Sequence, residues 1–188
     1  ITDGAVDGSS NLWSSGQGLG VKIGYGGISA GAYANERTKD SADSETDQDA
    51  MDATWHVSYS AGPVSIGYQT GGVDRGLAGA AASANTSAKK LTTANGNFEF
   101  EKMSIAANVN DNFSISWGEL AETYDAQASS VSGATGGADV EMKSTSIQFA
   151  YSMGSMSVKG YMTDTDNPGW DSDAESDEVT ELAVGFSF

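Results

Sequence analysis

Residues 178–188, which read E-V-T-E-L-A-V-G-F-S-F, carry the pattern on which the fold prediction rests. Large apolar residues occupy every second position at the end of this stretch, and small residues stand between them. The large residues are Leu182, Val184, Phe186 and Phe188, and the small ones are Ala183, Gly185 and Ser187. Such strict alternation predicts a β-strand with one apolar face and one small or polar face. Chain termini normally fray in water, so we expect the apolar face of this strand to contact lipid.

The composition favours short strands and turns over a large apolar core. The chain has 188 residues, enough for one domain, with 24 glycines, two prolines and no cysteine. Its hydrophobic fraction of 38% lies below the roughly 45–50% of soluble domains, a value that includes glycine. Transmembrane β-barrels have this profile because their apolar residues face outward and their interior is polar.

The net charge and the hydropathy of the chain argue against several classes of protein. The net charge of −17, from 26 acidic and 9 basic residues, argues against nucleic acid as a partner. No apolar run reaches the roughly 18 residues that a transmembrane helix needs. The absence of cysteine removes disulfides and thiolate metal sites. The chain starts without Met or a signal peptide, so we expect a processed chain or a fragment.

The alternation recurs along the chain and predicts nine strands and no helix. The predicted strands are 19–25, 28–35, 53–60, 64–69, 103–109, 113–117, 146–153, 156–162 and 178–188. The predicted loops are 1–18, 37–50, 71–96, 125–138 and 164–177. Phe98 and Phe100 stand at even positions and Met103 at an odd one, which predicts a bulge or a strand start near Glu101 and Lys102.

Short and long connections alternate. The short turns fall at 26–27, 61–63, 110–112 and 154–155, with long polar loops between them. Bacterial outer-membrane barrels have short periplasmic turns and long extracellular loops. The sequence therefore predicts an all-β fold, an antiparallel up-and-down transmembrane β-barrel, with residues 1–188 in a single domain.

Aromatic residues on the predicted lipid face fall into two bands, as expected where a membrane meets water. The predicted aromatic girdle is Tyr25, Trp55, Tyr59, Trp117, Tyr151, Phe186 and Phe188. In the alternative, these aromatics form the core of a two-sheet sandwich, but few other large apolar residues remain to pack against them.

An odd strand count conflicts with a complete barrel, because bacterial single-chain barrels have an even number of strands. We therefore expect the chain to be the C-terminal portion of a larger barrel. If it is complete, the count is wrong by one, and a barrel of eight or ten strands results.

The ending L-A-V-G-F-S-F resembles the C-terminal signature of outer-membrane β-barrel proteins. The acidic loops, Gly- and Ser-rich strands and hairpin spacing resemble the general diffusion porins of Gram-negative bacteria, of the alphaproteobacterial trimeric type. This resemblance implies sixteen strands, a homotrimer and a location in the bacterial outer membrane among lipid and lipopolysaccharide. It implies a water-filled channel for small hydrophilic solutes and ions, narrowed by a loop that follows the fifth strand and is missing here.

Charged residues with inward parity are the candidate channel lining: Lys22, Arg37, His56, Lys102, Lys159 and Glu181. One hypothesis is that the lysines and the arginine form a basic wall; in the other, these charges are simply solvated. His56 is the single histidine, too little for a metal site or a catalytic constellation. No catalytic or phosphate-binding motif occurs, so no enzyme activity is expected.

Alternating carboxylates at Asp43, Glu45, Asp47 and Asp49, and at Asp171, Asp173, Glu175 and Asp177, raise the question of calcium. Both stretches lack the glycine and the bidentate glutamate of a helix-loop-helix calcium site. Weak calcium binding that bridges lipopolysaccharide phosphates and plain solvation of the loops both remain open, and no other cofactor is expected.

Two other functions fit the composition. One is a small structural or adhesive outer-membrane barrel with a plugged lumen. The other is a soluble acidic β-sandwich that serves as a binding module.

Overall fold

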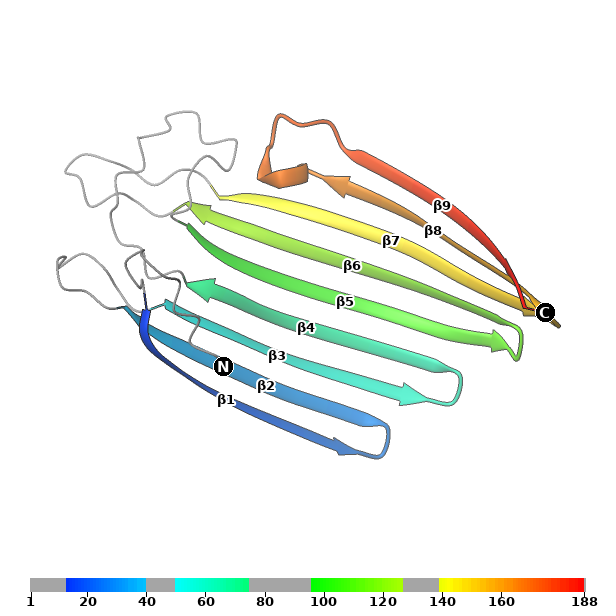
Figure 1. The fold of residues 1–188 in the computed structure, drawn as a ribbon, viewed down its shortest axis with the longest axis horizontal. Helices are drawn as coiled ribbons and strands as arrows, with labels where there is room; N and C mark the ends of the chain where they lie inside the picture. Colours follow the sequence, from blue (N-terminus) through cyan, green and yellow to red (C-terminus); the bar gives the residue numbers. More distant parts are fainter. Residues whose placement is uncertain (1–12, 40–49, 75–95, 127–138, 188) are drawn as a thin grey trace.

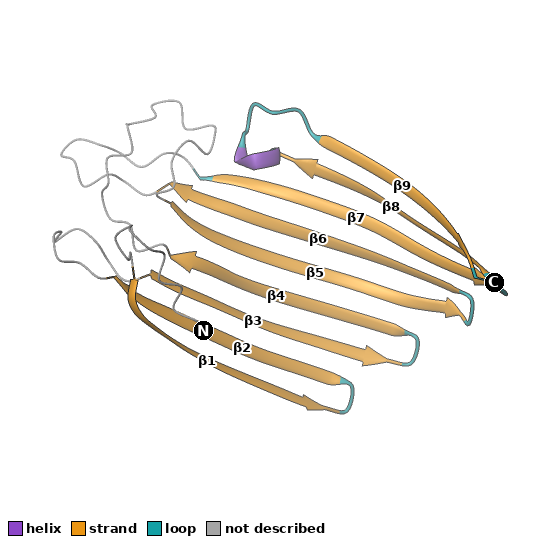
Figure 2. Cartoon of the chain, viewed as in Figure 1, coloured by secondary structure: helices purple, strands orange, loops and turns teal. Residues whose placement is uncertain are grey.

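The computed structural model describes residues 13–39, 50–74, 96–126 and 139–187, which form one antiparallel sheet in chain order (Figure 1). The strands are β1 Trp13–Tyr25, β2 Ile28–Lys39, β3 Ala50–Ala61, β4 Val64–Asp74, β5 Gly96–Asn110, β6 Phe113–Ala126, β7 Val140–Met153, β8 Met156–Asp166 and β9 Asp177–Phe186. A short 3-10 helix, η1 (Pro168–Trp170), lies between β8 and β9 (Figure 2). The all-β class, the nine strands and their up-and-down order are confirmed.

The sheet is open. Each inner strand pairs with both of its sequence neighbours, and β1 and β9 are the two edges within the described residues. These residues form one sheet, not the two layers of a sandwich. Since nine strands alternate in direction, β1 and β9 run the same way.

Four tight turns lie at one end of the sheet, and the strand ends between which the longer segments of sequence fall lie at the other (Figure 1). Gly26 and Gly27 both have positive φ, 57° and 85°, the backbone that two-residue hairpins require. A Cβ on Gly27 would lie 2.3 Å from the carbonyl oxygen of Ser60, so only glycine fits there. The predicted asymmetry of the turns is therefore confirmed.

Each hairpin is displaced by two residues along the strands relative to the hairpin before it. The row through Tyr25 and Ile28 continues to Tyr59, two residues before the second hairpin closes at Ala61. The row through Ala61 and Val64 reaches Ile115, two residues beyond the third hairpin's closing residue, Phe113. The row through Phe113 reaches Tyr151, two residues before Met153. The turns therefore form a staircase of one residue per strand, visible in Figure 1.

Several predicted strand ends are wrong because most strands continue beyond their apolar portion. β1 begins at Trp13, inside the predicted 1–18 loop, and β6 continues to Ala126. β2 and β8 also reach into predicted loops, to Lys39 and Asp166. In these extensions large apolar residues do not recur at every second position, so apolar alternation gave no signal for a strand.

The predicted bulge or strand start near Glu101 is also wrong, because β5 already begins at Gly96. Lys102 pairs with Gln69 and Glu101 pairs with Thr70 in an unbroken register. The irregularity in β5 falls between Asn108 and Asn110, next to the turn into β6. Phe98 and Phe100 keep the regular alternation and lie on the opposite face from Met103.

Candidate functional site: the two faces of the sheet

One face of the sheet, here the apolar face, carries most of the large apolar side chains. Cross-strand pairing joins them into rows, the longest of which crosses eight strands. It contains Tyr25, Ile28, Tyr59, Ile66, Ile105, Trp117, Ile147 and Met162. A continuous apolar surface therefore runs across the sheet from β1 to β8.

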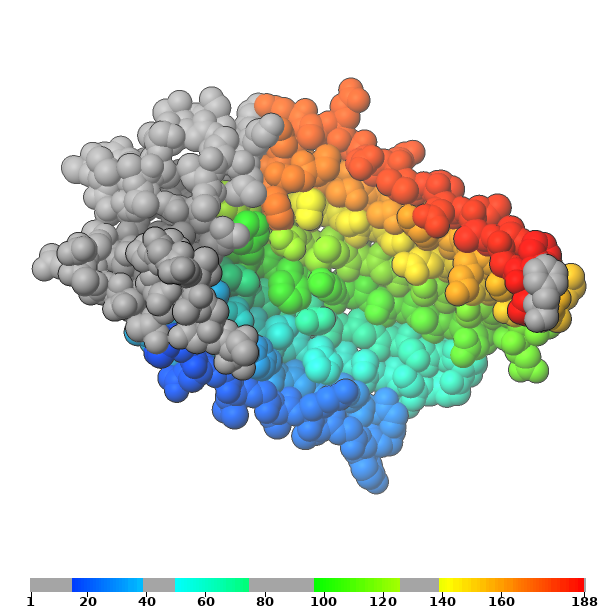
Figure 3. All heavy atoms as spheres, viewed as in Figure 1, coloured from blue at the N-terminus to red at the C-terminus, as the bar shows by residue number. Residues whose placement is uncertain are grey.

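The apolar face is the more exposed of the two faces. Every exposed large hydrophobic side chain in the described residues lies on it, except Tyr33 and Val179. In β3, Met51, Trp55 and Val57 are exposed, whereas the polar-face residues between them are half-buried. In the space-filling view, the strands lie side by side with no second layer over the middle of the face drawn (Figure 3). This sheet therefore reverses the arrangement of a water-soluble fold.

Water alone is a poor solvent for this surface. Burying one large aliphatic or aromatic side chain gains roughly 1.5–3 kcal/mol, so a half-exposed one forgoes about 1 kcal/mol. More than twenty such side chains are exposed. An exposed apolar surface of this size favours coverage by an apolar environment or a partner.

The apolar surface has a lower and an upper limit. At one end of the strands it stops at the tight turns. At the other end it stops where charged residues occupy the same face. The first charged residues after a turn are Glu36 on β2, Asp74 on β4, Glu119 on β6 and Asp164 on β8. They stand six to ten positions after the first residue of the strand, eight on average. Eight positions correspond to about 27 Å along a strand at roughly 3.4 Å per residue.

The opposite face, here the polar face, is built from small and hydroxylated residues. One row reads Gly24, Ser29, Ser58, Gly67, Ser104, Gly118, Ser146 and Thr163. Hydroxyl groups bond across strands, as between Ser146 and Thr163 at 3.1 Å. Hollows of about 550 and 580 Å³ are lined mainly by residues of this face, and one of about 790 Å³ is lined mainly by residues of the apolar face.

All six predicted channel-lining residues lie on the polar face, and three of them share a row. This row runs Lys22, Gly31, His56, Gln69 and Lys102 across β1 to β5. A Cβ on Gly31 would lie 2.6 Å from His56 Cε1, so the imidazole lies over this glycine and toward Lys22. Lys102 Nζ lies 4.8 Å from the Phe100 ring centroid.

The other three predicted lining residues lie apart from that row. Lys159 on β8 stands between Ala150 and Ala183. Glu181 on β9 accepts a hydrogen bond of 3.0 Å from the Tyr161 hydroxyl. Within the described residues no ion pair involves Lys22, Lys102 or Lys159.

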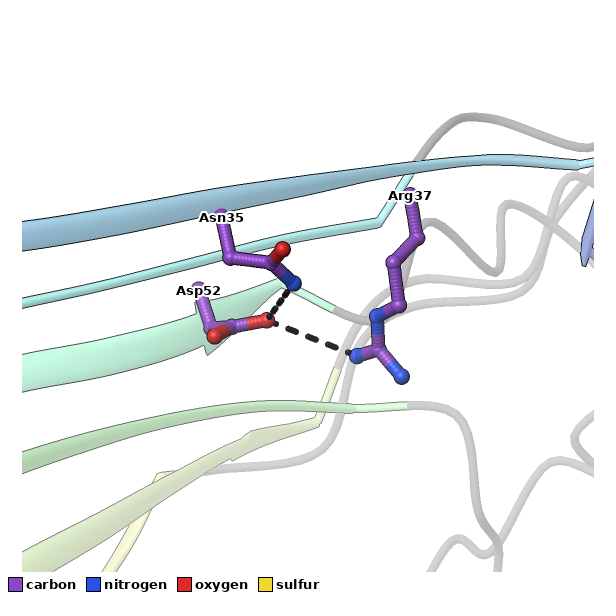
Figure 4. A network of polar contacts seen from close by, with 3 residues as sticks. All are labelled: Asn35, Arg37 and Asp52. Carbon is purple, nitrogen blue, oxygen red and sulfur yellow. Dashed lines mark hydrogen bonds and ion pairs between the residues drawn. The ribbon is translucent and has the colours of Figure 1, made fainter. Parts of the chain in front are cut away.

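Arg37 differs because an acid partly neutralises it (Figure 4). Its Nη2 lies 3.6 Å from Asp52 Oδ1 on the neighbouring strand. The same carboxylate oxygen accepts a hydrogen bond of 3.2 Å from Asn35 Nδ2. This network lies on the polar face at the end where the long connections emerge.

Six of the predicted girdle aromatics lie on the apolar face: Tyr25, Trp55, Tyr59, Trp117, Tyr151 and Phe186. Trp55 packs against Tyr68, with ring centroids 5.3 Å apart. Phe188 lies outside the described residues.

No group of three or more His, Asp or Glu side chains in the described ranges could hold a metal ion. The acidic stretch 43–49 lies outside them. The part of the chain that the structure describes contains no helix long and apolar enough to cross a bilayer.

The sequence reasoning missed one aromatic cluster on the polar face. Phe98 packs against Tyr124 and Trp170, with both centroid distances 5.1 Å. Tyr124 and Val140 are nearly fully buried, at 4% and 7% exposed. The available signal was the position of Phe98 and Phe100, which the two-residue repeat of β5 places on the face opposite Met103.

Comparison with known proteins adds no identity. No protein-family model, curated protein or solved structure matches this chain. Function is therefore inferred from the two faces.

Proposed function

We propose that this sheet is the wall of an outer-membrane β-barrel whose polar face lines a water-filled channel for small hydrophilic solutes and ions. The observation that carries the proposal is the reversed exposure of the two faces. The side chains of the apolar face are exposed, and the opposite face carries serine, glycine and lysine. With lipid on the apolar face and water on the polar face, each face contacts the solvent that its side chains favour.

The dimensions of the apolar surface support lipid as its solvent. A displacement of one residue per strand, at roughly 3.4 Å rise and 4.8 Å strand spacing, corresponds to a strand tilt of about 35°. Barrel strands are tilted by about 35–45°. With this tilt, the 27 Å of apolar strand spans about 22 Å along the barrel axis, close to the roughly 25 Å apolar band of outer-membrane barrels.

Closure is part of the proposal. Because β1 and β9 run in the same direction, a fully antiparallel barrel needs an odd number of further strands between these edges. A barrel of sixteen strands, assembled as a trimer in the bacterial outer membrane, meets this requirement. It is the form that the resemblance to diffusion porins implies.

The proposed mechanism is passive. Solutes small enough for the lumen diffuse along the polar face, and fixed charges there select among ions. Lys22, Lys102 and Lys159 attract anions within a Debye length of about 8–10 Å. Serine hydroxyls replace part of a solute's hydration shell. No step forms or breaks a covalent bond, so the proposed role is transport and not enzyme catalysis.

Reconstitution in planar lipid bilayers tests this function. The folded protein should produce discrete conductance steps that scale with salt concentration, and heat-unfolded protein should not. Folded protein that inserts into the bilayer and conducts no current would overturn the proposal.

A further inference from the structure

The connection between β8 and β9 lies over the polar face at the end opposite the tight turns. Trp170, in η1, meets the Phe98 ring of β5 at a centroid distance of 5.1 Å and an interplanar angle of 68°. Its Nε1–H donates a hydrogen bond of 3.1 Å to the Glu122 carbonyl oxygen on β6. Phe98 pairs with Tyr124 on the polar face, so the Trp170 ring lies on that face, beyond the intervening strand β7.

The backbone of this connection is held in an unusual conformation. Asn167, Gly169 and Trp170 have positive φ values of 50°, 70° and 55°. A positive φ is uncommon for a residue as bulky as tryptophan and persists where surrounding contacts impose it. Here the contacts are the Phe98 ring, the Glu122 carbonyl and a hydrogen bond of 2.7 Å from Asn167 Nδ2 to the Glu141 carbonyl.

The anchored segment carries negative charge. Asp171, Asp173 and Glu175 follow Trp170 directly, and β9 begins at Asp177. Lys22, Lys102 and Lys159 lie on the polar face. An acidic segment held over this face alters both the width and the electrostatic potential of the entrance.

We propose that Trp170 is a latch that holds residues 167–176 over the entrance of the channel, where the segment limits conductance and favours cations. This inference rests on the proposed channel function. In this inference the contact of Trp170 with β5 and β6 controls the entrance, and the number of acidic residues alone does not.

Single-channel recording of Trp170→Ala, with Trp170→Phe as its matched control, tests the latch. Trp170→Ala removes the ring contact and the hydrogen bond, so conductance should rise and cation preference should fall. Trp170→Phe keeps a ring against Phe98 and should stay closer to the unsubstituted protein. Equal conductance and equal reversal potential in all three proteins would overturn the latch. A protein without any channel activity would instead overturn the proposed function.

Charge labelling tests the same contact without weakening the fold. The chain has no cysteine, so Ser172→Cys gives one exposed thiol beside the anchor. Positively and negatively charged methanethiosulfonate reagents should shift the reversal potential in opposite directions. The shifts should shrink in the Trp170→Ala background, where the segment is released. No shift with either reagent in the Trp170 background would overturn the latch, even where Trp170→Ala fails to fold.

Discussion

Ile105 of β5 lies directly opposite Ile66 of β4 on the apolar face, and both side chains remain about half exposed, at 44% and 50%. Two β-branched residues in direct cross-strand contact usually mark the buried side of a sheet. Here the contact lies in the middle of the exposed row from Tyr25 to Met162. Lipid is the environment that we propose for it.

A charge at this position should be costly only if lipid covers it. Arginine in the middle of a barrel's lipid face costs about 2–4 kcal/mol, and near the interfaces about 0–1 kcal/mol. Ile105→Arg should therefore lower the free energy of unfolding from lipid vesicles by about 2–4 kcal/mol. The neighbouring Ala106→Arg points to the polar face and serves as the control, with a much smaller loss. Equal losses from the two substitutions would argue against a lipid-facing Ile105.

Charge reversal on the polar face should change ion selectivity. Lys22→Glu combined with Lys102→Glu replaces two cations in one row with anions, so the reversal potential in a salt gradient should shift toward cation preference. Lys143 is the control, because it lies on the other face and pairs with Glu119 at 3.0 Å. Lys143→Glu should leave the reversal potential nearly unchanged. If all three proteins share one reversal potential, these lysines do not line the channel.

A glycine covered by an aromatic ring offers a test of packing on the apolar face. Phe149 faces Gly160 across β7 and β8, and a Cβ on Gly160 would lie 2.6 Å from Phe149 Cε1. Gly160→Ala should displace the ring from its rotamer and destabilise the protein by about 1 kcal/mol. In a Phe149→Ala background the same change should stabilise by roughly 0.5–1 kcal/mol, because alanine costs less chain entropy than glycine. Denaturant titration of the four proteins measures this coupling, and additive effects would contradict the contact.

Removing the carboxylate beside Arg37 should change ion selectivity and leave stability nearly unchanged. The Arg37–Asp52 pair is partly exposed, at 40% and 31%, so Asp52→Asn should change stability by less than about 1 kcal/mol. Arg37 would lose a neutralising carboxylate, and the reversal potential should shift toward anion preference. An unchanged reversal potential would show that the charges of Arg37 and Asp52 do not act on the channel.

The strands were predictable wherever one face is apolar. Large apolar residues stand at every second position from Leu19 to Tyr25 and from Leu182 to Phe186. This two-residue repeat was enough to locate β1 and β9. It failed beyond the apolar surface, where residues such as Glu36 and Arg37 put charge on both faces. Pairing with the neighbouring strand continues there without any change in hydropathy that a sequence could show.

The polar face was predictable residue by residue, but its contacts were not. Parity alone assigned Lys22, His56 and Lys102 to one side. It could not show that they share a row, because register depends on the lengths of all the intervening turns. The contact between Phe98 and Trp170 joins residues 72 positions apart in the chain, and neither residue's local sequence specifies the other as a partner.

Single-cysteine scanning along residues 64–69 of β4 tests the central claim most directly, because the native chain has no cysteine. Each cysteine would carry a nitroxide, and its collisions with oxygen, which enters lipid, and with a water-soluble nickel complex would be measured in vesicles. We predict period-two alternation: oxygen contact at positions 64, 66 and 68, and contact with the nickel complex at 65, 67 and 69. Contact with the nickel complex at all six positions, or alternation of the opposite phase, would contradict a sheet with lipid on its apolar face and water on its polar face.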